Sequence, residues 1–108
     1  MTLRIGVNGA GGRMGQRVVA LTNADPDLQL TVALEAPGSP VLGRDAGELA
    51  GVGACGVIIS DQLTAPVDVI IDFSTPDGLA AILAICEERR IPLVIATTGL
   101  TEAQRKTV

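Results

Sequence analysis

The stretch VNGAGGRMG, residues 7–15, places four glycines in nine residues, directly after a short apolar run. Gly9, Gly12 and Gly15 follow the spacing G-x-x-G-x-x-G, a variant of the turn that joins a strand to a helix in dinucleotide-binding folds. In such a turn one glycine permits the tight bend, one lets phosphates approach the backbone, and one lets the helix pack on the strand. The pyrophosphate lies at the helix N-terminus, where backbone N–H groups lack partners. A plain glycine-rich loop is the alternative.

An acidic residue, Glu35, ends the next apolar run, about 20 residues after Gly15. In dinucleotide-binding folds a carboxylate at this place accepts hydrogen bonds from ribose hydroxyls. A solvated carboxylate at a strand end is the alternative. Because strand, glycine turn, helix, strand and acid follow in the expected order, we interpret these residues as a dinucleotide site. A P-loop is excluded, since the chain has no Gly-Lys-Ser/Thr sequence after its glycines.

Polar residues also follow two later apolar runs. Asp72, Phe73 and Ser74 close one of them, and the residues Ala96-Thr97-Thr98-Gly99 close another. Ligands of open parallel sheets bind outside the carboxyl ends of the strands, so both groups could meet a cofactor. Two alternatives stay open: Phe73, the single aromatic residue, as a core side chain, and the threonines as caps of a turn.

Apolar runs rich in Val, Ile and Leu alternate along the chain with helical patterns. This order predicts an α/β fold of the Rossmann-like kind, an open parallel sheet with helices on both faces and right-handed crossovers. We expect one domain over residues 1–108. The predicted strands cover residues 3–7, 28–35, 57–60, 67–73 and 92–99, and the predicted helices cover residues 13–23, a short piece around 45–50, residues 75 to about 90, and the chain from 101 onward.

The spacing of apolar residues predicts which side chains face the core. In the first helix Met14, Val18 and Leu21 recur at helical intervals, and in the second strand Leu28, Leu30, Val32 and Leu34 alternate with Gln29, Thr31 and Ala33. In the third helix Leu79, Ile82, Leu83 and Cys86 form an apolar stripe, which leaves Glu87, Glu88 and Arg90 toward water. Cys86 is therefore expected to be a small buried hydrophobe.

The composition limits the classes of function. A net charge of −4 with no basic cluster argues against nucleic acid or an anionic membrane as a partner. The chain contains no histidine, the commonest general base and metal ligand, so we expect no catalytic residue and no metal site in it. Two cysteines do not make a disulfide framework. No apolar run reaches membrane-spanning length, and we expect a cytoplasmic protein.

Five ordered segments together resemble the N-terminal domain of the 4-hydroxy-tetrahydrodipicolinate reductase (dihydrodipicolinate reductase) family. They are GAGGRMG, ALE, GSPVLGRDAGELAG, IDFSTPDG and VIATTGL, and the resemblance extends over essentially all 108 residues. It implies that this domain binds NADH or NADPH and that the whole enzyme reduces a cyclic imine in diaminopimelate and lysine biosynthesis.

The resemblance also implies cofactor-binding roles for particular positions. The glycine turn would surround the pyrophosphate, Glu35 would take the adenosine ribose hydroxyls, and Phe73 would lie beside the cofactor. Ala96, Thr97 and Thr98, at the end of the last predicted strand, would line the nicotinamide side. The full set is Gly9, Ala10, Gly11, Gly12, Arg13, Met14, Glu35, Phe73, Ala96, Thr97 and Thr98.

Two positions depart from the family pattern. Family members often carry an arginine just after the acidic residue, whereas Ala36 and Pro37 follow Glu35 here. A carboxylate with no cation beside it repels a 2′-phosphate, so we expect a preference for NADH; the alternative is that Arg44 reaches in from the loop to pair with the phosphate. In addition, Ala96 stands where the family has glycine.

Members of the family carry a second domain that binds the substrate through histidines and a lysine. We therefore expect this chain to be the cofactor-binding half of a reductase that ends before the substrate domain and is inactive alone. A homotetramer is implied for the whole protein. A non-catalytic NAD-binding regulatory module and another Rossmann amino-acid dehydrogenase are the alternatives.

Overall fold

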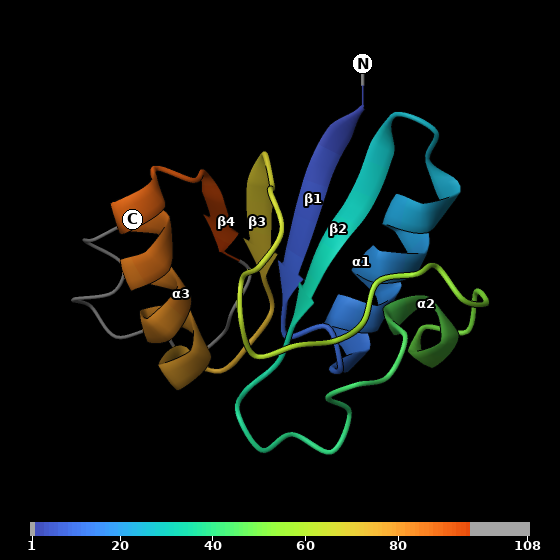
Figure 1. Ribbon diagram of the computed structural model, residues 1–108, viewed down its shortest axis with the longest axis horizontal. Coiled ribbons are helices and arrows are strands. Elements are labelled where there is room, and N and C mark those ends of the chain that lie inside the picture. Colours follow the sequence, from blue (N-terminus) through green and yellow to red (C-terminus); the bar gives the residue numbers. More distant parts are fainter. Residues whose placement is uncertain (1, 96–108) are drawn as a thin grey trace.

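A computed structural model of the chain describes residues 2–95. Four parallel strands form one sheet in the order β2-β1-β3-β4, which confirms the predicted fold class (Figure 1). The helices and strands are β1 (Leu3–Asn8), α1 (Arg13–Ala24), β2 (Leu28–Leu34), α2 (Ala46–Leu49), β3 (Val69–Asp72), α3 (Pro76–Arg89) and β4 (Leu93–Ile95).

Helices cover both faces of the sheet, with α1 and α2 on one side and α3 on the other (Figure 1). On the first side Ile5 and Val7 of β1 pack with Val19 of α1. On the second side Ile70 of β3 packs with Leu79 and Ile82 of α3. Both faces of the central strands are therefore buried, as the continuous apolar runs of the sequence require.

The buried face of α1 differs from the predicted one. Val18 packs against the core, but Met14 and Leu21 are 51% and 64% exposed, while Gly15, Val19 and Thr22 are buried. The reason is the close contact of Gly15 with the backbone of the preceding turn, because a Cβ there would overlap the carbonyl oxygen of Gly9. This contact sets the rotation of the helix about its axis, so the buried stripe is displaced from the one that the apolar spacing predicts.

A β-bulge changes the predicted alternation in β2. Ile5 of β1 pairs with Leu30, but the next residue, Gly6, pairs with Val32, so Thr31 is an extra residue in the strand. Side chains after a bulge point to the other face of the sheet. Leu30 therefore packs on the α1 side, whereas Val32 lies in the core on the α3 side. The alternation thus locates the strand correctly, but Leu28 and Leu30 pack on one side of the sheet and Val32 and Leu34 on the other.

The segment predicted as a strand at 57–60 makes only two isolated bridges, an antiparallel one from Ile58 to Asp45 and a parallel one from Ser60 to Leu34. Because these bridges join the segment to two different partners, no continuous ladder forms.

Asp45 organises the loop that precedes this segment. Its carboxylate accepts hydrogen bonds from the backbone N–H groups of Gly47, Glu48, Cys55 and Gly56 at 2.8–3.1 Å. These bonds, with that of Cys55 the largest influence, lower the pKa of Asp45 to about 2.

The third helix follows the prediction. Thr75 caps α3 by accepting a hydrogen bond from the backbone N–H of Gly78 at 3.2 Å, and Pro76 occupies the first turn. Leu79, Ile82 and Cys86 are buried.

The end of the last predicted strand and the helix predicted from residue 101 lie outside the described residues. None of the helices within residues 2–95 has the length and apolar composition that a membrane span requires.

Candidate dinucleotide site

A cavity of about 600 Å³ opens at the carboxyl edge of the sheet. Its walls come from the glycine turn after β1, the residues that follow β2, the turn between β3 and α3, and the first turns of α3. Cavities of this size and position are typical of cofactor sites in open α/β folds. The lining residues are Asn8, Gly9, Gly12, Leu34, Glu35, Ala36, Pro37, Asp61, Leu63, Phe73, Ser74, Thr75, Asp77, Gly78, Ala81, Ile82 and Ile85.

The three glycines of the G-x-x-G-x-x-G spacing have different surroundings. Gly9 has a φ of +88°, and a Cβ there would lie 2.8 Å from the backbone carbonyl of Phe73. Gly15 packs directly on the backbone of Gly9. At Gly12, in contrast, the single neighbour within 4 Å of a Cβ is the carbonyl oxygen of Gly9, at an ordinary 3.5 Å. The fold itself therefore requires glycine at 9 and 15, while position 12 borders open space in the cavity.

The glycine turn leaves a set of backbone donors at the start of α1. The N–H groups of Gly9 and Ala10 both donate to the carbonyl oxygen of Leu34, and that of Gly12 donates to Gly9. The next three N–H groups, those of Arg13, Met14 and Gly15, donate to no acceptor within residues 2–95. The first turn of α1 also lacks an acidic residue and a side-chain cap. The positive end of the helix dipole is thus available to an anion.

Glu35 lies against this turn. Its Oε2 accepts a hydrogen bond from the backbone N–H of Gly11 at 2.7 Å, and its Oε1 accepts a weaker one from Ala36 at 3.3 Å. A Cβ at Gly11 would lie 2.9 Å from the same Oε2, so glycine at 11 makes room for the carboxylate. Glu35 lines the cavity and retains lone pairs toward it, so it can accept hydrogen bonds from a ligand hydroxyl.

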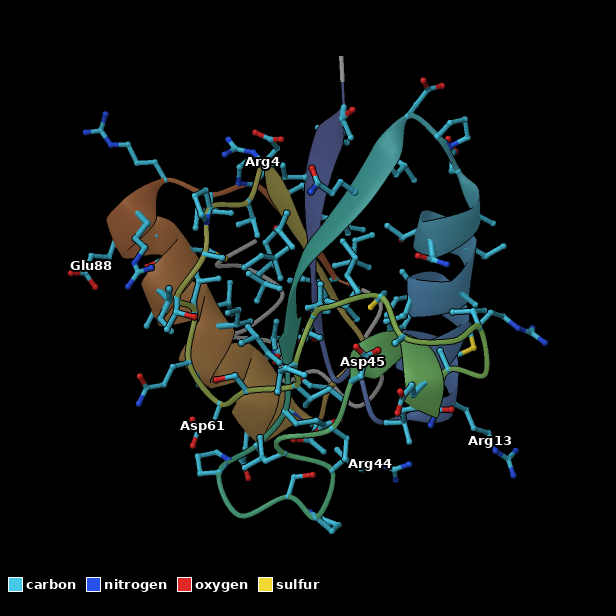
Figure 2. The ribbon with its side chains drawn as sticks, turned by 45° about the vertical axis from the view of Figure 1, so that its right-hand side comes forward. Arg4, Arg13, Arg44, Asp45, Asp61 and Glu88 are labelled. Carbon is cyan, nitrogen blue, oxygen red and sulfur yellow. The ribbon has the colours of Figure 1, made fainter. Side chains whose placement is uncertain are left out.

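The rest of the cavity combines an apolar wall with acidic groups. Leu63, Ile82 and Ile85 contribute apolar surface, and Asp61 and Asp77 contribute carboxylates at the rim. No lysine or arginine of residues 2–95 lines the cavity. Figure 2 shows Arg13 and Arg44 pointing away from the body of the molecule, while Asp61 lies near the start of α3.

A buried polar network lies beneath the cavity, and the sequence pattern does not reveal it. The side-chain amide of Asn8 donates to Oδ1 of Asp72 at 2.8 Å, and the hydroxyl of Ser74 donates to the same oxygen at 2.6 Å. Asp72 is fully buried and Asn8 is 8% exposed. Burial raises the pKa of Asp72, and the bonds from Ser74 and Asn8 act in the opposite direction. The sequence pattern singles out Asp72 and Ser74 as polar residues at a strand end, but it does not place Asn8 beside them, because the pairing of β1 with β3 is a property of the folded chain.

The predicted site residues divide into four groups. Gly9, Gly12, Glu35 and Phe73 line the one cavity. Ala10 is 2% exposed beneath the turn, and the N–H of Gly11 is held by Glu35. The side chains of Arg13 and Met14 are exposed outside the lining, so what they offer to the site is backbone N–H groups. Ala96, Thr97 and Thr98 lie outside the described residues. The described part of the chain contains no cluster of three or more potential metal ligands.

Comparison with known proteins gives a consistent result. Residues 3–108 match the family model described as "Dihydrodipicolinate reductase, N-terminus". Two similar curated proteins are named 4-hydroxy-tetrahydrodipicolinate reductase: that of Halorhodospira halophila is 45% identical and that of Methylococcus capsulatus 46% identical, each over 111 residues. Both alignments cover 100% of this chain but 42% and 41% of the respective relative.

Two solved structures have the same fold. A dipicolinate-bound dihydrodipicolinate reductase from Paenisporosarcina sp. TG-14 superposes with a TM-score of 0.71 at 23% identity, over 98% of this chain and 41% of that one. A myo-inositol dehydrogenase from Corynebacterium glutamicum superposes with a TM-score of 0.66 at 28% identity, over 88% of this chain and 28% of that one. This chain therefore spans less than half the length of each of these relatives.

Proposed function

Since the chain belongs to the dihydrodipicolinate reductase family, whose N-terminal part it matches, we propose that it is the nicotinamide-dinucleotide-binding part of a 4-hydroxy-tetrahydrodipicolinate reductase. The observation that carries the proposal is the start of α1. Three consecutive backbone N–H groups without partners in the described chain lie at the positive end of a helix, after a turn whose Gly12 leaves open space. That combination suits a pyrophosphate.

The remaining walls suit the other parts of a dinucleotide. Glu35, held by Gly11, would accept hydrogen bonds from the adenosine ribose hydroxyls. The apolar wall of Leu63, Ile82 and Ile85 offers a surface for the adenine ring. We propose that Phe73 lies beside the cofactor and that Ala96, Thr97 and Thr98 line its nicotinamide side.

The charges around the cavity favour NADH over NADPH. Glu35, Asp61 and Asp77 line it, and no basic side chain of the described residues does. An NADPH 2′-phosphate placed near Glu35 would meet like charge without a compensating cation. The exposed Arg44 points away from the molecule, so it would have to move to pair with that phosphate (Figure 2).

When bound, the reduced nicotinamide supplies a hydride, which the whole enzyme would transfer to the C=N bond of a cyclic imine. The residues of this chain would hold the pyrophosphate, orient the ribose and fix the ring position; none of them is proposed to move a proton. The chain has no histidine, so we propose that groups outside it bind and protonate the substrate and that it does not turn over alone. For the whole protein we further propose a cytoplasmic homotetramer.

The proposal is tested by titrating the 108-residue chain with NADH and with NADPH and following the nicotinamide fluorescence. We expect saturable binding of both and a lower dissociation constant for NADH. Absence of binding would refute the dinucleotide site, and clearly tighter binding of NADPH would refute the charge argument alone. Turnover of the imine by the chain at an ordinary enzyme rate would refute the assignment of catalytic groups to another domain.

A further inference from the structure

The Asn8 side chain, at the end of β1, lies among three acceptors that come from the end of β3, the turn after it and the first turn of α3. Its Nδ2 lies 2.8 Å from Oδ1 of Asp72 at the end of β3, 3.3 Å from the hydroxyl oxygen of Ser74, and 3.3 Å from the carbonyl oxygen of Gly78 in the first turn of α3. An amide nitrogen carries two hydrogens, and three acceptors surround this one. Its donors are therefore committed within the protein and are not available to a ligand.

We propose that Asn8 is a positioning residue of the dinucleotide site, whose amide holds the turn after β3 and the start of α3 against the glycine turn. This inference rests on the proposed function. It adds a residue that acts on the cofactor through other residues, rather than by contact between its amide donors and the ligand.

The geometry around Gly78 supports this role. Glycine in a helix is unfavourable by roughly 1 kcal/mol relative to alanine, so its presence in the first turn of α3 needs a reason. A Cβ there would lie 2.6 Å from the Ser74 hydroxyl oxygen. Gly78 thus leaves space for Ser74 to reach Asp72, while its carbonyl accepts from Asn8. The first turn of α3 therefore takes part in the polar network through Gly78, which contacts Ser74 and accepts from Asn8.

The network is coupled directly to the walls of the cavity. The backbone N–H of Phe73 donates to the carbonyl oxygen of Asn8 at 2.9 Å, and Gly9, the next residue, lies against the backbone of Phe73 and Ser74. Asn8, Phe73, Ser74 and Gly78 all line the cavity. A displacement of the turn after β3 would therefore move two walls of the site at once, the glycine turn and the start of α3.

The chemistry at position 8 calls for a neutral donor. Asp72 is a fully buried carboxylate, and hydrogen bonds from Asn8 and Ser74 compensate its loss of hydration. Asn8→Asp keeps the shape of the side chain but places a second carboxylate beside Asp72. Such a pair cannot readily ionise twice, and when it holds one proton, the shared O–H restores a donor. Among the other titratable groups on the surrounding elements, Cys86 of α3 has a thiol pKa that is raised by burial and by the charge of Asp72, and Glu35, Asp61 and Asp77 line the cavity.

The test measures the dissociation constant of NADH for the 108-residue chain and its Asn8→Asp, Ser74→Ala and Asn23→Asp variants. Asn23 is exposed near the end of α1, so Asn23→Asp adds the same charge away from the site. At about pH 8.5 we expect Asn8→Asp to bind about tenfold more weakly than the unmodified chain, and at about pH 6 to recover to within roughly threefold. Asn23→Asp should follow the unmodified chain at both values. Thermal unfolding without cofactor checks that each protein is folded at the assay temperature.

Each outcome of these titrations either supports or overturns the positioning role of Asn8. Equal NADH affinity of Asn8→Asp and Asn23→Asp at both pH values overturns the inference. An Asn8→Asp protein whose NADH affinity is weakened by the same factor at both pH values also overturns it, because a merely structural defect does not depend on protonation. If Asn8→Asp does not fold at the higher pH, the Ser74→Ala variant tests the inference instead, because it removes one hydrogen-bond donor to Asp72. An NADH affinity weakened about three- to tenfold supports the inference, whereas an unchanged affinity overturns it. If the unmodified chain binds neither NADH nor NADPH, the proposed function itself fails, and the inference fails with it.

Discussion

Two glycines three residues apart should respond to the same substitution in opposite ways. Gly15→Ala places a methyl group on the backbone of Gly9, where the nearest atoms after the overlapping carbonyl oxygen are its carbonyl carbon at 2.8 Å and the Cα of Ala10 at 3.0 Å. That backbone is held by two hydrogen bonds to Leu34 at 2.9 and 3.0 Å, so it cannot move away cheaply. Gly12→Ala places its methyl group at 3.5 Å from the nearest atom, toward the cavity.

The magnitudes follow from these contacts. Overpacking against backbone typically lowers the free energy of unfolding by about 1–3 kcal/mol, so Gly15→Ala should lower the melting temperature by roughly 5–12 °C. At Gly12 the φ of −77° and ψ of 169° suit alanine, and the free energy of unfolding should change by no more than about 0.5 kcal/mol. The methyl group would, however, keep a phosphate from one charge-assisted hydrogen bond at the helix start. Because such a bond contributes about 1.5–3 kcal/mol, NADH affinity should fall roughly 10- to 100-fold.

Thermal unfolding followed by circular dichroism and NADH titration by fluorescence, both on the same preparations, measure the two effects. The reasoning is refuted if Gly12→Ala binds NADH within about twofold of the unmodified chain, or if it lowers the melting temperature as much as Gly15→Ala does. A Gly15→Ala protein as stable as the parent would show that the turn yields more easily than its hydrogen bonds indicate.

Three further predictions concern other parts of the chain. Glu35→Gln keeps an acceptor for the N–H of Gly11 but removes the charge, so NADH affinity should fall about tenfold while the NADPH-to-NADH affinity ratio rises, as parallel titrations would reveal; an unchanged ratio would count against the charge argument. Asp45→Ala should lower the melting temperature by about 5 °C at neutral pH. The pKa of Asp45 is lowered from its ordinary 3.8 to about 2, so the stabilisation by its carboxylate is fully present above the ordinary value and is lost as pH falls through about 2. The difference in melting temperature between the two proteins should therefore shrink in acid, and a difference that stays constant would contradict this role of the carboxylate. Cys86, 4% exposed and with a raised pKa, should react with a thiol reagent such as Ellman's far more slowly than Cys55 until the chain is unfolded; equal rates in the native state would contradict its burial.

Local patterns were sufficient for much of this molecule. The glycine spacing of residues 9–15 placed the strand-to-helix turn, and the alternation of apolar runs with helical segments predicted the parallel sheet. The Thr75-Pro76 entrance and the stripe from Leu79 to Cys86 located α3 and its buried face. These features depend on short-range sterics, capping and periodicity, which act between residues close in sequence.

The remaining features depend on contacts between distant residues. The rotation of α1 follows from Gly15 meeting Gly9, a backbone contact that hydrophobic spacing does not encode. The extra residue at Thr31 reverses the faces of β2, so Ala33 packs on the α1 side, and Glu35 reaches the N–H of Gly11. Strand pairing sets such a register, because a one-residue shift moves every following side chain to the other face.

The grouping of polar side chains at the sheet edge has the same origin. Asn8 and Asp72 are 64 residues apart, and the local sequence around either residue does not predict that their side chains meet. They meet because β1 and β3 are parallel neighbours that pair Asn8 with Asp72. Residue types and local spacing thus predict that a dinucleotide site follows β1, whereas the parallel pairing of the folded chain determines which polar groups lie beneath it and hold its walls together.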